Sequence, residues 1–179
     1  MSIWTIGHST SNFGEFVAAL AAHQIQLLVD LRAFPASPRY PHFNRAHLEA
    51  ELPNGGIAYQ WLGTALGGRR TPSREAPHIA LRNESFRGYA DHMLTPQFHS
   101  AILDLLDRAA ASRVAIMCAE KLWWRCHRSM ISDYLTSVCG HEVLHIHDAR
   151  RVEPHRVNRL ARIEQQSLIY DRQETRRLL

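Results

Sequence analysis

The densest group of reactive side chains lies between Cys118 and Cys126, with Glu120 inside the segment and His127 directly after it. The order of strand and helix patterns places Cys126 in or just before the first turn of a helix. Free amide groups and the helix dipole stabilise a thiolate at that position. With His127 or His8 as the base and Glu120 as the group that orients it, the segment has the parts of a thiol nucleophile site.

The same segment admits other interpretations. Two thiolates and an imidazole suit a tetrahedral zinc or iron site, with Cys118, Cys126 and a histidine as ligands, although the spacing of the cysteines is not that of a zinc finger. Rhodanese and cysteine-phosphatase loops also join a strand, a cysteine, an arginine and a helix, but Cys118 lies seven residues before Arg125 instead of five. For Cys139, a small buried structural residue is the preferred interpretation.

Arginine supplies almost all of the positive charge, because Lys121 is the only lysine in a chain of net charge +4. Guanidinium groups bind oxyanions in bidentate fashion, so this balance favours anionic partners. The residues that we assign to substrate binding are Ser9, Arg32, Arg69, Arg125, His127 and Arg128. No phosphate-loop or dinucleotide fingerprint is present, and we predict no nucleotide cofactor.

Five short apolar runs must position these side chains. They read as buried strands, at residues 3–6, 25–31, 57–62, 114–117 and 142–146. Helical patterns separate them, with start signals at Asn12, Asn83 and Thr95. This alternation predicts a mostly parallel sheet of about five strands flanked by helices, with a rhodanese-like topology as one option. Ligands bind outside the carboxyl ends of such strands, where the polar side chains gather.

The chain of 179 residues fits one α/β domain spanning residues 1–179. Its tail, at about 154–177, has apolar residues on one side and arginines on the other, which predicts an amphipathic helix. No run of about 18 apolar residues exists, so we expect no membrane association. Three cysteines fit a reducing compartment better than a disulfide framework, which favours a cytoplasmic location.

Six segments of the chain, in consistent order, resemble one known family. They are residues 5–10, 29–35, 56–59, 66–68, 118–120 and 126–128. The family is the domain-of-unknown-function family 488, and the likeness runs from about residue 3 to residue 147. It implies a compact bacterial or archaeal cytoplasmic α/β protein, and it brings no established reaction. The family's usual Asp-Val-Arg stands here as Asp30-Leu31-Arg32.

The leading hypothesis is an enzyme that acts on an anionic substrate carrying phosphate or a nucleotide. Its chemical groups are His8, Asp30, Glu120 and Cys126, with Asp30 either a general base or the partner of Arg32 in an internal ion pair. A competing hypothesis is a noncatalytic module that binds nucleic acid or a protein through arginines and exposed tryptophans. A metal-binding protein, through cysteines and histidine, is the third.

Overall fold

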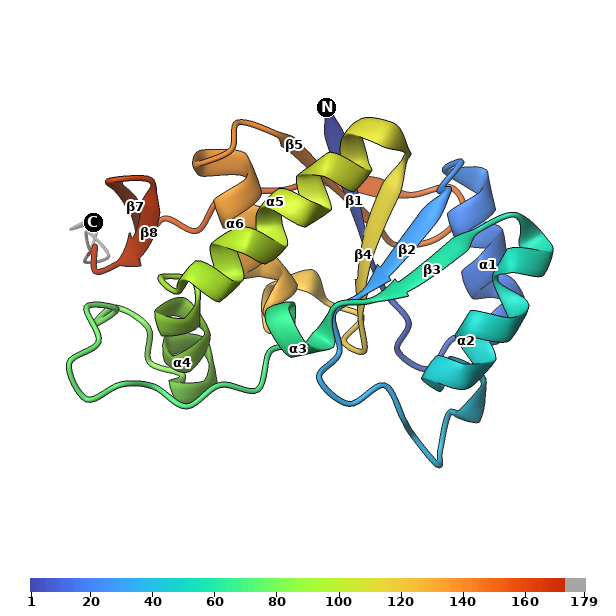
Figure 1. Ribbon diagram of the computed structural model, residues 1–179, viewed down its shortest axis with the longest axis horizontal. Helices are drawn as coiled ribbons and strands as arrows, with labels where there is room; N and C mark the ends of the chain where they lie inside the picture. Colours follow the sequence, from blue (N-terminus) through green and yellow to red (C-terminus); the bar gives the residue numbers. More distant parts are fainter. Residues whose placement is uncertain (173–179) are drawn as a thin grey trace, which may run out of the picture.

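The computed structural model describes residues 1–172, which fold around a six-stranded sheet (Figure 1). The strands are β1 (Ser2–Gly7), β2 (Leu27–Asp30), β3 (Ala58–Trp61), β4 (Val114–Cys118), β5 (Glu142–Ile146) and β6 (Val152–Pro154). They lie in the order β3-β2-β4-β1-β5-β6. The first five are parallel, and β6 pairs antiparallel with β5 at one edge. The predicted α/β class and mostly parallel sheet are therefore confirmed.

Helices cover both faces of the sheet. They are α1 (Phe13–Ala22), α2 (Arg45–Glu51), α3 (Gly63–Leu66), α4 (Glu84–His92), α5 (Pro96–Ala111) and α6 (Arg128–Ser137), with short 3₁₀ helices η1 (Pro41–Phe43), η2 (Pro53–Gly55) and η3 (Trp123–Arg125). The side chains of Asn12, Asn83 and Thr95 cap α1, α4 and α5 as predicted. None of the helices within residues 1–172 has the length and apolar character that crossing a bilayer requires.

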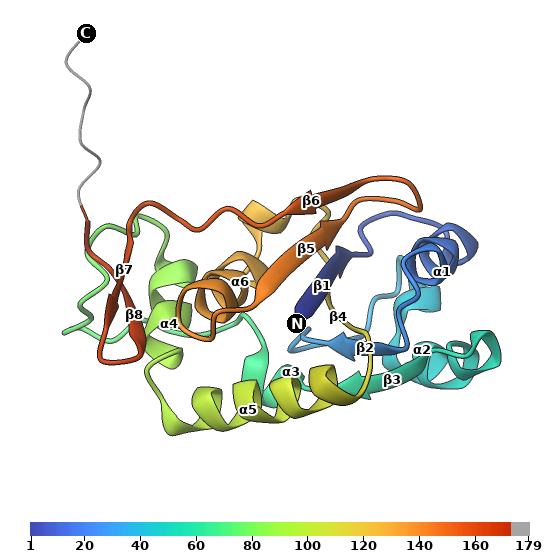
Figure 2. The ribbon, with the colours of Figure 1, turned by 90° about the horizontal axis from the view of Figure 1, so that it is seen from above.

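Two apolar cores lie on opposite faces of the sheet. Along β4, Ala115 and Met117 face the core beneath α1 and α2, whereas Ile116 faces the core beneath α5 and α6 (Figure 2). Because successive side chains of a strand point to opposite faces, a strand covered on both sides must be apolar throughout. All five residues of β4 are buried, so polar functional side chains have to lie at or beyond the end of the strand.

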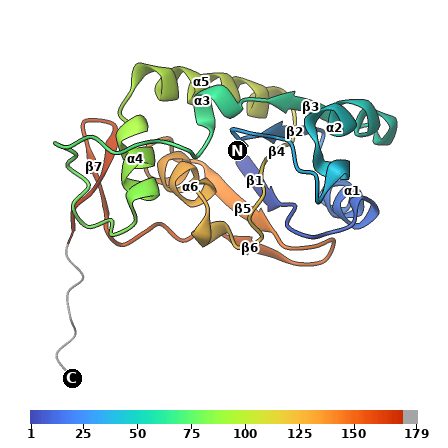
Figure 3. The same cartoon turned by 90° about the horizontal axis from the view of Figure 1, so that it is seen from below.

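The predicted helix at 154–177 is wrong for the residues that the structure describes, and residues 173–177 lie outside them. The segment contains β6 and then a hairpin of β7 (Ala161–Glu164) and β8 (Ser167–Tyr170). Gln165 and Gln166 both have positive φ, as a tight hairpin turn requires. The Gln165-Gln166 pair is not the Asn-Gly pair that usually marks such a turn, so the local sequence does not indicate it. The hairpin lies beside α4, at the end of the molecule away from α1 and α2 (Figure 3).

Candidate active site

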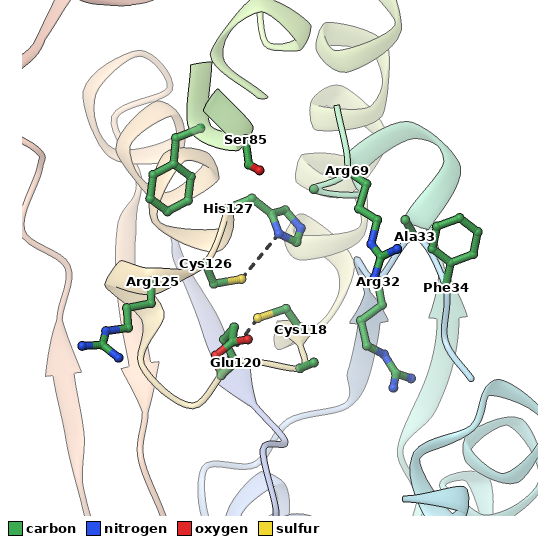
Figure 4. Close-up of a pocket in the computed structure, with 13 residues that line it drawn as sticks. Arg32, Ala33, Phe34, Arg69, Ser85, Cys118, Glu120, Arg125, Cys126 and His127 are labelled. Atoms are coloured by element: carbon green, nitrogen blue, oxygen red, sulfur yellow. Dashed lines mark hydrogen bonds between the residues drawn. The ribbon is translucent and has the colours of Figure 1, made fainter. Parts of the chain in front are cut away.

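A pocket of about 300 Å³ opens at the carboxyl ends of the parallel strands (Figure 4). Its lining comes from the ends of β2 and β4, the start of α4, the turn after α3 and the turn before α6. The side chains that carry chemistry there are Arg32, Arg69, Cys118, Glu120, Arg125, Cys126 and His127. A second hollow of about 290 Å³ shares Arg32 and Glu120 with it and adds His8 and Ser9. Together the two hollows form one groove across the sheet end.

Cys126 occupies the turn that leads from η3 into α6. Its Sγ lies 3.4 Å from Nδ1 of His127 and accepts the backbone N–H of Arg128 at 3.5 Å. Burial by itself raises the pKa of this thiol. The neighbouring Cys118 thiol, the His127 ring and the Arg128 guanidinium outweigh burial and bring the pKa well below its ordinary value. This lowering favours the thiolate form of Cys126.

The pKa of Cys118, the last residue of β4, is shifted in the opposite direction. Burial raises its pKa, and the neighbouring Cys126 thiolate raises it further. The thiol also lies 3.7 Å from the backbone carbonyl of Glu120, to which it donates. Figure 4 shows the two sulfur atoms next to each other in the pocket. The site thus shifts the pKa values of two buried sulfurs in opposite directions, down for Cys126 and up for Cys118.

The His127 ring is held by packing from two other elements. Tyr89 of α4 lies against it with ring centroids 5.0 Å apart. On the turn after α3, Gly68 touches the ring so closely that a Cβ at this position would fall 2.4 Å from Nδ1. Glycine is the residue that leaves room for such an approach. Gly68 therefore helps to place the imidazole beside the Cys126 sulfur.

Asp30 and Arg32 form a buried ion pair beneath the second hollow. The guanidinium donates to both carboxylate oxygens at 2.6–3.1 Å and to the backbone carbonyl of Phe43 at 2.7 Å. Tyr59 donates its hydroxyl to the same carboxylate. Nη1 of Arg32 also donates to Nε2 of His8 at 3.2 Å, and burial and the Arg32 charge lower the His8 pKa to about 4. Asp30 is thus a partner of Arg32 and does not line the pocket.

Arg128 points away from the pocket into a buried polar chain. Its Nη1 donates to the Thr5 hydroxyl at 3.2 Å, which donates to Nδ1 of His145 at 2.7 Å. Nε2 of His145 donates to His155 at 3.0 Å, and His155 donates to the Asp133 carboxylate at 2.9 Å. This direction follows because a guanidinium only donates and a carboxylate only accepts. Burial and the neighbouring His155 lower the His145 pKa to about 2, which keeps this imidazole neutral.

The structure therefore separates the predicted site residues into two groups. Those on the walls of the groove are His8, Ser9, Arg32, Arg69, Glu120, Arg125, Cys126 and His127. Asp30 and Arg128 lie underneath and support neighbouring groups. Sequence reasoning did not single out Gly68 or Tyr89, whose contacts with His127 join elements far apart in the chain. Their only sequence signals are the Gly67-Gly68 pair and an aromatic residue at helical spacing.

Two of the alternative interpretations, the metal site and binding through exposed tryptophans, lose part of their support. Within residues 1–172, no three histidine, cysteine, aspartate or glutamate side chains gather in a way that could hold a metal ion. Of the two tryptophans between Cys118 and Cys126, Trp124 is exposed, but Trp123 is buried and stacks on His145 with ring centroids 4.2 Å apart. A pair of exposed tryptophans for binding a partner is therefore not present.

The fold and the pocket define an α/β protein with a cysteine–histidine site at the carboxyl end of a parallel sheet. The model of the family described as "Domain of unknown function DUF488" matches residues 12–135, and the chain belongs to this family. The match includes Cys118, Cys126, His127 and the Asp30–Arg32 ion pair. A search of curated proteins found no match. No solved structure matches either, so the rhodanese-like topology stays a prediction.

Proposed function

We propose that the protein is an enzyme that uses the Cys126 thiolate as a nucleophile toward a small anionic substrate. The observation that carries this proposal is the arrangement around the sulfur, which contacts His127 and the Arg128 amide while lining an open pocket. A thiol buried for structural reasons alone is protonated and inert. The conditions around Cys126 instead favour the reactive form.

The charges around the pocket support an anionic substrate. Of the described side chains that line it, Arg32, Arg69 and Arg125 carry a guanidinium, and Glu120 alone carries a carboxylate. Arg69 and Arg125 are exposed, with the Arg69 guanidinium 5.1 Å from the centroid of the Phe34 ring, whereas Arg32 is held in place by Asp30 and His8. One fixed guanidinium and two exposed ones suit the recognition of phosphate or carboxylate oxygens.

The remaining predicted residues take supporting roles in this proposal. His8 and Asp30 position Arg32, because they occupy most of its donors and leave one side toward the groove. Glu120 lies on the wall shared by both hollows, where its carboxylate can accept a proton or orient a substrate hydroxyl. His127 is the residue that exchanges a proton with the Cys126 sulfur.

Alkylation by iodoacetamide at neutral pH, followed by peptide mapping, tests the nucleophile. We expect Cys126 to react well before Cys139, whose pKa is raised by burial. Inorganic phosphate should slow the reaction of Cys126, and the combined substitution Arg69→Ala and Arg125→Ala should remove this protection. Equal rates at Cys126 and Cys139 would overturn the proposed nucleophile.

A screen of phosphate esters, nucleotides and other anionic electrophiles then tests the enzyme itself. Any activity found should disappear in Cys126→Ala and persist in the matched control Cys139→Ala. Cys139 is a suitable control because it lies beyond the end of α6 and does not line the pocket. An activity that survives in Cys126→Ala would refute the assignment.

A further inference from the structure

The proposed nucleophile has a second thiol beside it that the proposed reaction does not use. Cys118 and Cys126 both line the same pocket, and their side chains are close enough to influence each other's ionisation. Their sulfurs point toward one another between the end of β4 and the start of α6 (Figure 4). Cys139, the third cysteine, has no part in this arrangement.

The segment between the two cysteines is held so that they stay together. Nη2 of Arg128 donates to the backbone carbonyl of Glu120 at 2.6 Å, which pulls the start of the segment toward α6. Gly7 of β1 allows this close approach, because a Cβ there would fall 1.8 Å from the same carbonyl oxygen. Two thiols kept in contact by the backbone are placed for exchange with each other.

From this geometry we infer that Cys118 and Cys126 form a dithiol–disulfide couple that reduces small anionic disulfides. The inference rests on the proposed function, since it uses the same Cys126 nucleophile and the same arginines. A low-molecular-weight disulfide whose thiol bears carboxylates or phosphate is the substrate class that the Arg69 and Arg125 side chains fit.

The reaction proceeds by two exchanges. In the first, the Cys126 thiolate attacks one sulfur of the substrate disulfide, forms a mixed disulfide and releases one substrate thiolate. In the second, the Cys118 sulfur attacks Cys126 Sγ, and the other substrate thiol leaves with the Cys118 proton. The protein gains one Cys118–Cys126 disulfide and gives two electrons to the substrate disulfide, which is released as one thiolate and one thiol.

The states of the two thiols suit these roles. Exchange begins from a thiolate, and the lowered pKa of Cys126 favours that form. Cys118 remains protonated until the mixed disulfide has removed the negative charge of Cys126, which is one of the causes that raise the Cys118 pKa. The second sulfur therefore becomes a better nucleophile only after the first has reacted.

Glutathione disulfide, which carries several carboxylates, is the probe for the test. The fully reduced protein is mixed with it, quenched with acid and analysed by intact mass and peptide mapping. We expect the wild type to form the Cys118–Cys126 disulfide without retained glutathione. The Cys118→Ser and Cys118→Ala variants should stop with one glutathione on Cys126, and the control Cys139→Ser should behave as the wild type.

Two results would overturn the inference. One is a wild type that keeps glutathione on Cys126, as the Cys118 variants do; the other is no reaction with the disulfide although iodoacetamide still alkylates Cys126. In both cases the proposed nucleophile stands, whereas loss of the alkylation itself removes the proposed function. Circular dichroism confirms that each variant is folded.

The charge of the substrate is tested separately with hydroxyethyl disulfide, which is neutral. Because one exposed arginine–carboxylate contact contributes up to about 1 kcal/mol, or about fivefold in rate, we expect the charged disulfide to react up to about fivefold faster per contact after correction for intrinsic reactivity. Arg69→Ala with Arg125→Ala should abolish this preference. A neutral disulfide that reacts equally fast would contradict the assigned substrate class.

Discussion

Gly68 offers a way to displace the His127 ring without changing either cysteine. In Gly68→Ala, the new Cβ would lie 2.4 Å from Nδ1 and 2.7 Å from Cγ of the imidazole. The ring has little freedom to adjust, because Tyr89 packs against it as well. We therefore expect the imidazole to leave its position 3.4 Å from the Cys126 sulfur, and the thiolate to lose that partner.

The size of the effect follows from the hydrogen bond that is lost. A hydrogen bond to a charged group contributes about 1.5–3 kcal/mol, and one pKa unit corresponds to about 1.4 kcal/mol. The Cys126 pKa should rise by about one to two units in Gly68→Ala. The assay is the rate of iodoacetamide alkylation at Cys126 as a function of pH, because only the thiolate reacts.

A matched control is Gly14→Ala in α1, where a Cβ meets nothing closer than 3.5 Å. Its alkylation profile should superimpose on that of the wild type. If Gly68→Ala also leaves the midpoint of the profile unchanged while the protein stays folded, the role given to His127 is refuted. His127→Gln provides a direct comparison, since it should shift the midpoint in the same direction.

Three further predictions concern the groups beneath the pocket. Asp133 accepts hydrogen bonds from His155, Asn158 and Tyr170, so Asp133→Asn should lower the free energy of unfolding by about 3 kcal/mol in urea titrations. The exposed control Asp104→Asn should lower it by under about 1 kcal/mol. Equal losses in the two variants would contradict this prediction. The pKa of His145 is lowered to about 2, so between pH ~6.5 and pH ~4 the unfolded chain binds a proton that the folded protein does not. As the pH is lowered through this range, the free energy of unfolding should fall by about 1.4 kcal/mol per pH unit because of this residue. If the dependence of the unfolding free energy on pH is unchanged in His145→Gln, this account is wrong. Tyr59→Phe removes a hydrogen bond to Asp30 and should lower the free energy of unfolding by about 1–2 kcal/mol in the same titrations. No change would mean that the Asp30–Arg32 ion pair does not need this third partner.

The sequence predicted the architecture because its main signals are local. β4 is apolar in every residue, Asn12 and Thr95 cap helices, and strand and helix patterns alternate along the chain. The structure of the C-terminal segment was not predicted, because the turn at Gln165 and Gln166 has no glycine. The hairpin is held instead by contacts with α4 and α6, which are distant in the sequence. Long-range packing there overrides the local helical pattern.

For the site, the sequence by itself determined which side chains lie near the strand ends: Cys118 at the end of β4, Arg32 after β2, and Cys126 just before α6. Only the tertiary structure decided what each of them does. It buried Asp30 and Arg128 as supports, brought Gly68 against His127, and set the two cysteines side by side. The physical reason is that the pKa of a thiol depends on burial and on charges a few ångströms away, and the residues that supply them come from separate parts of the chain.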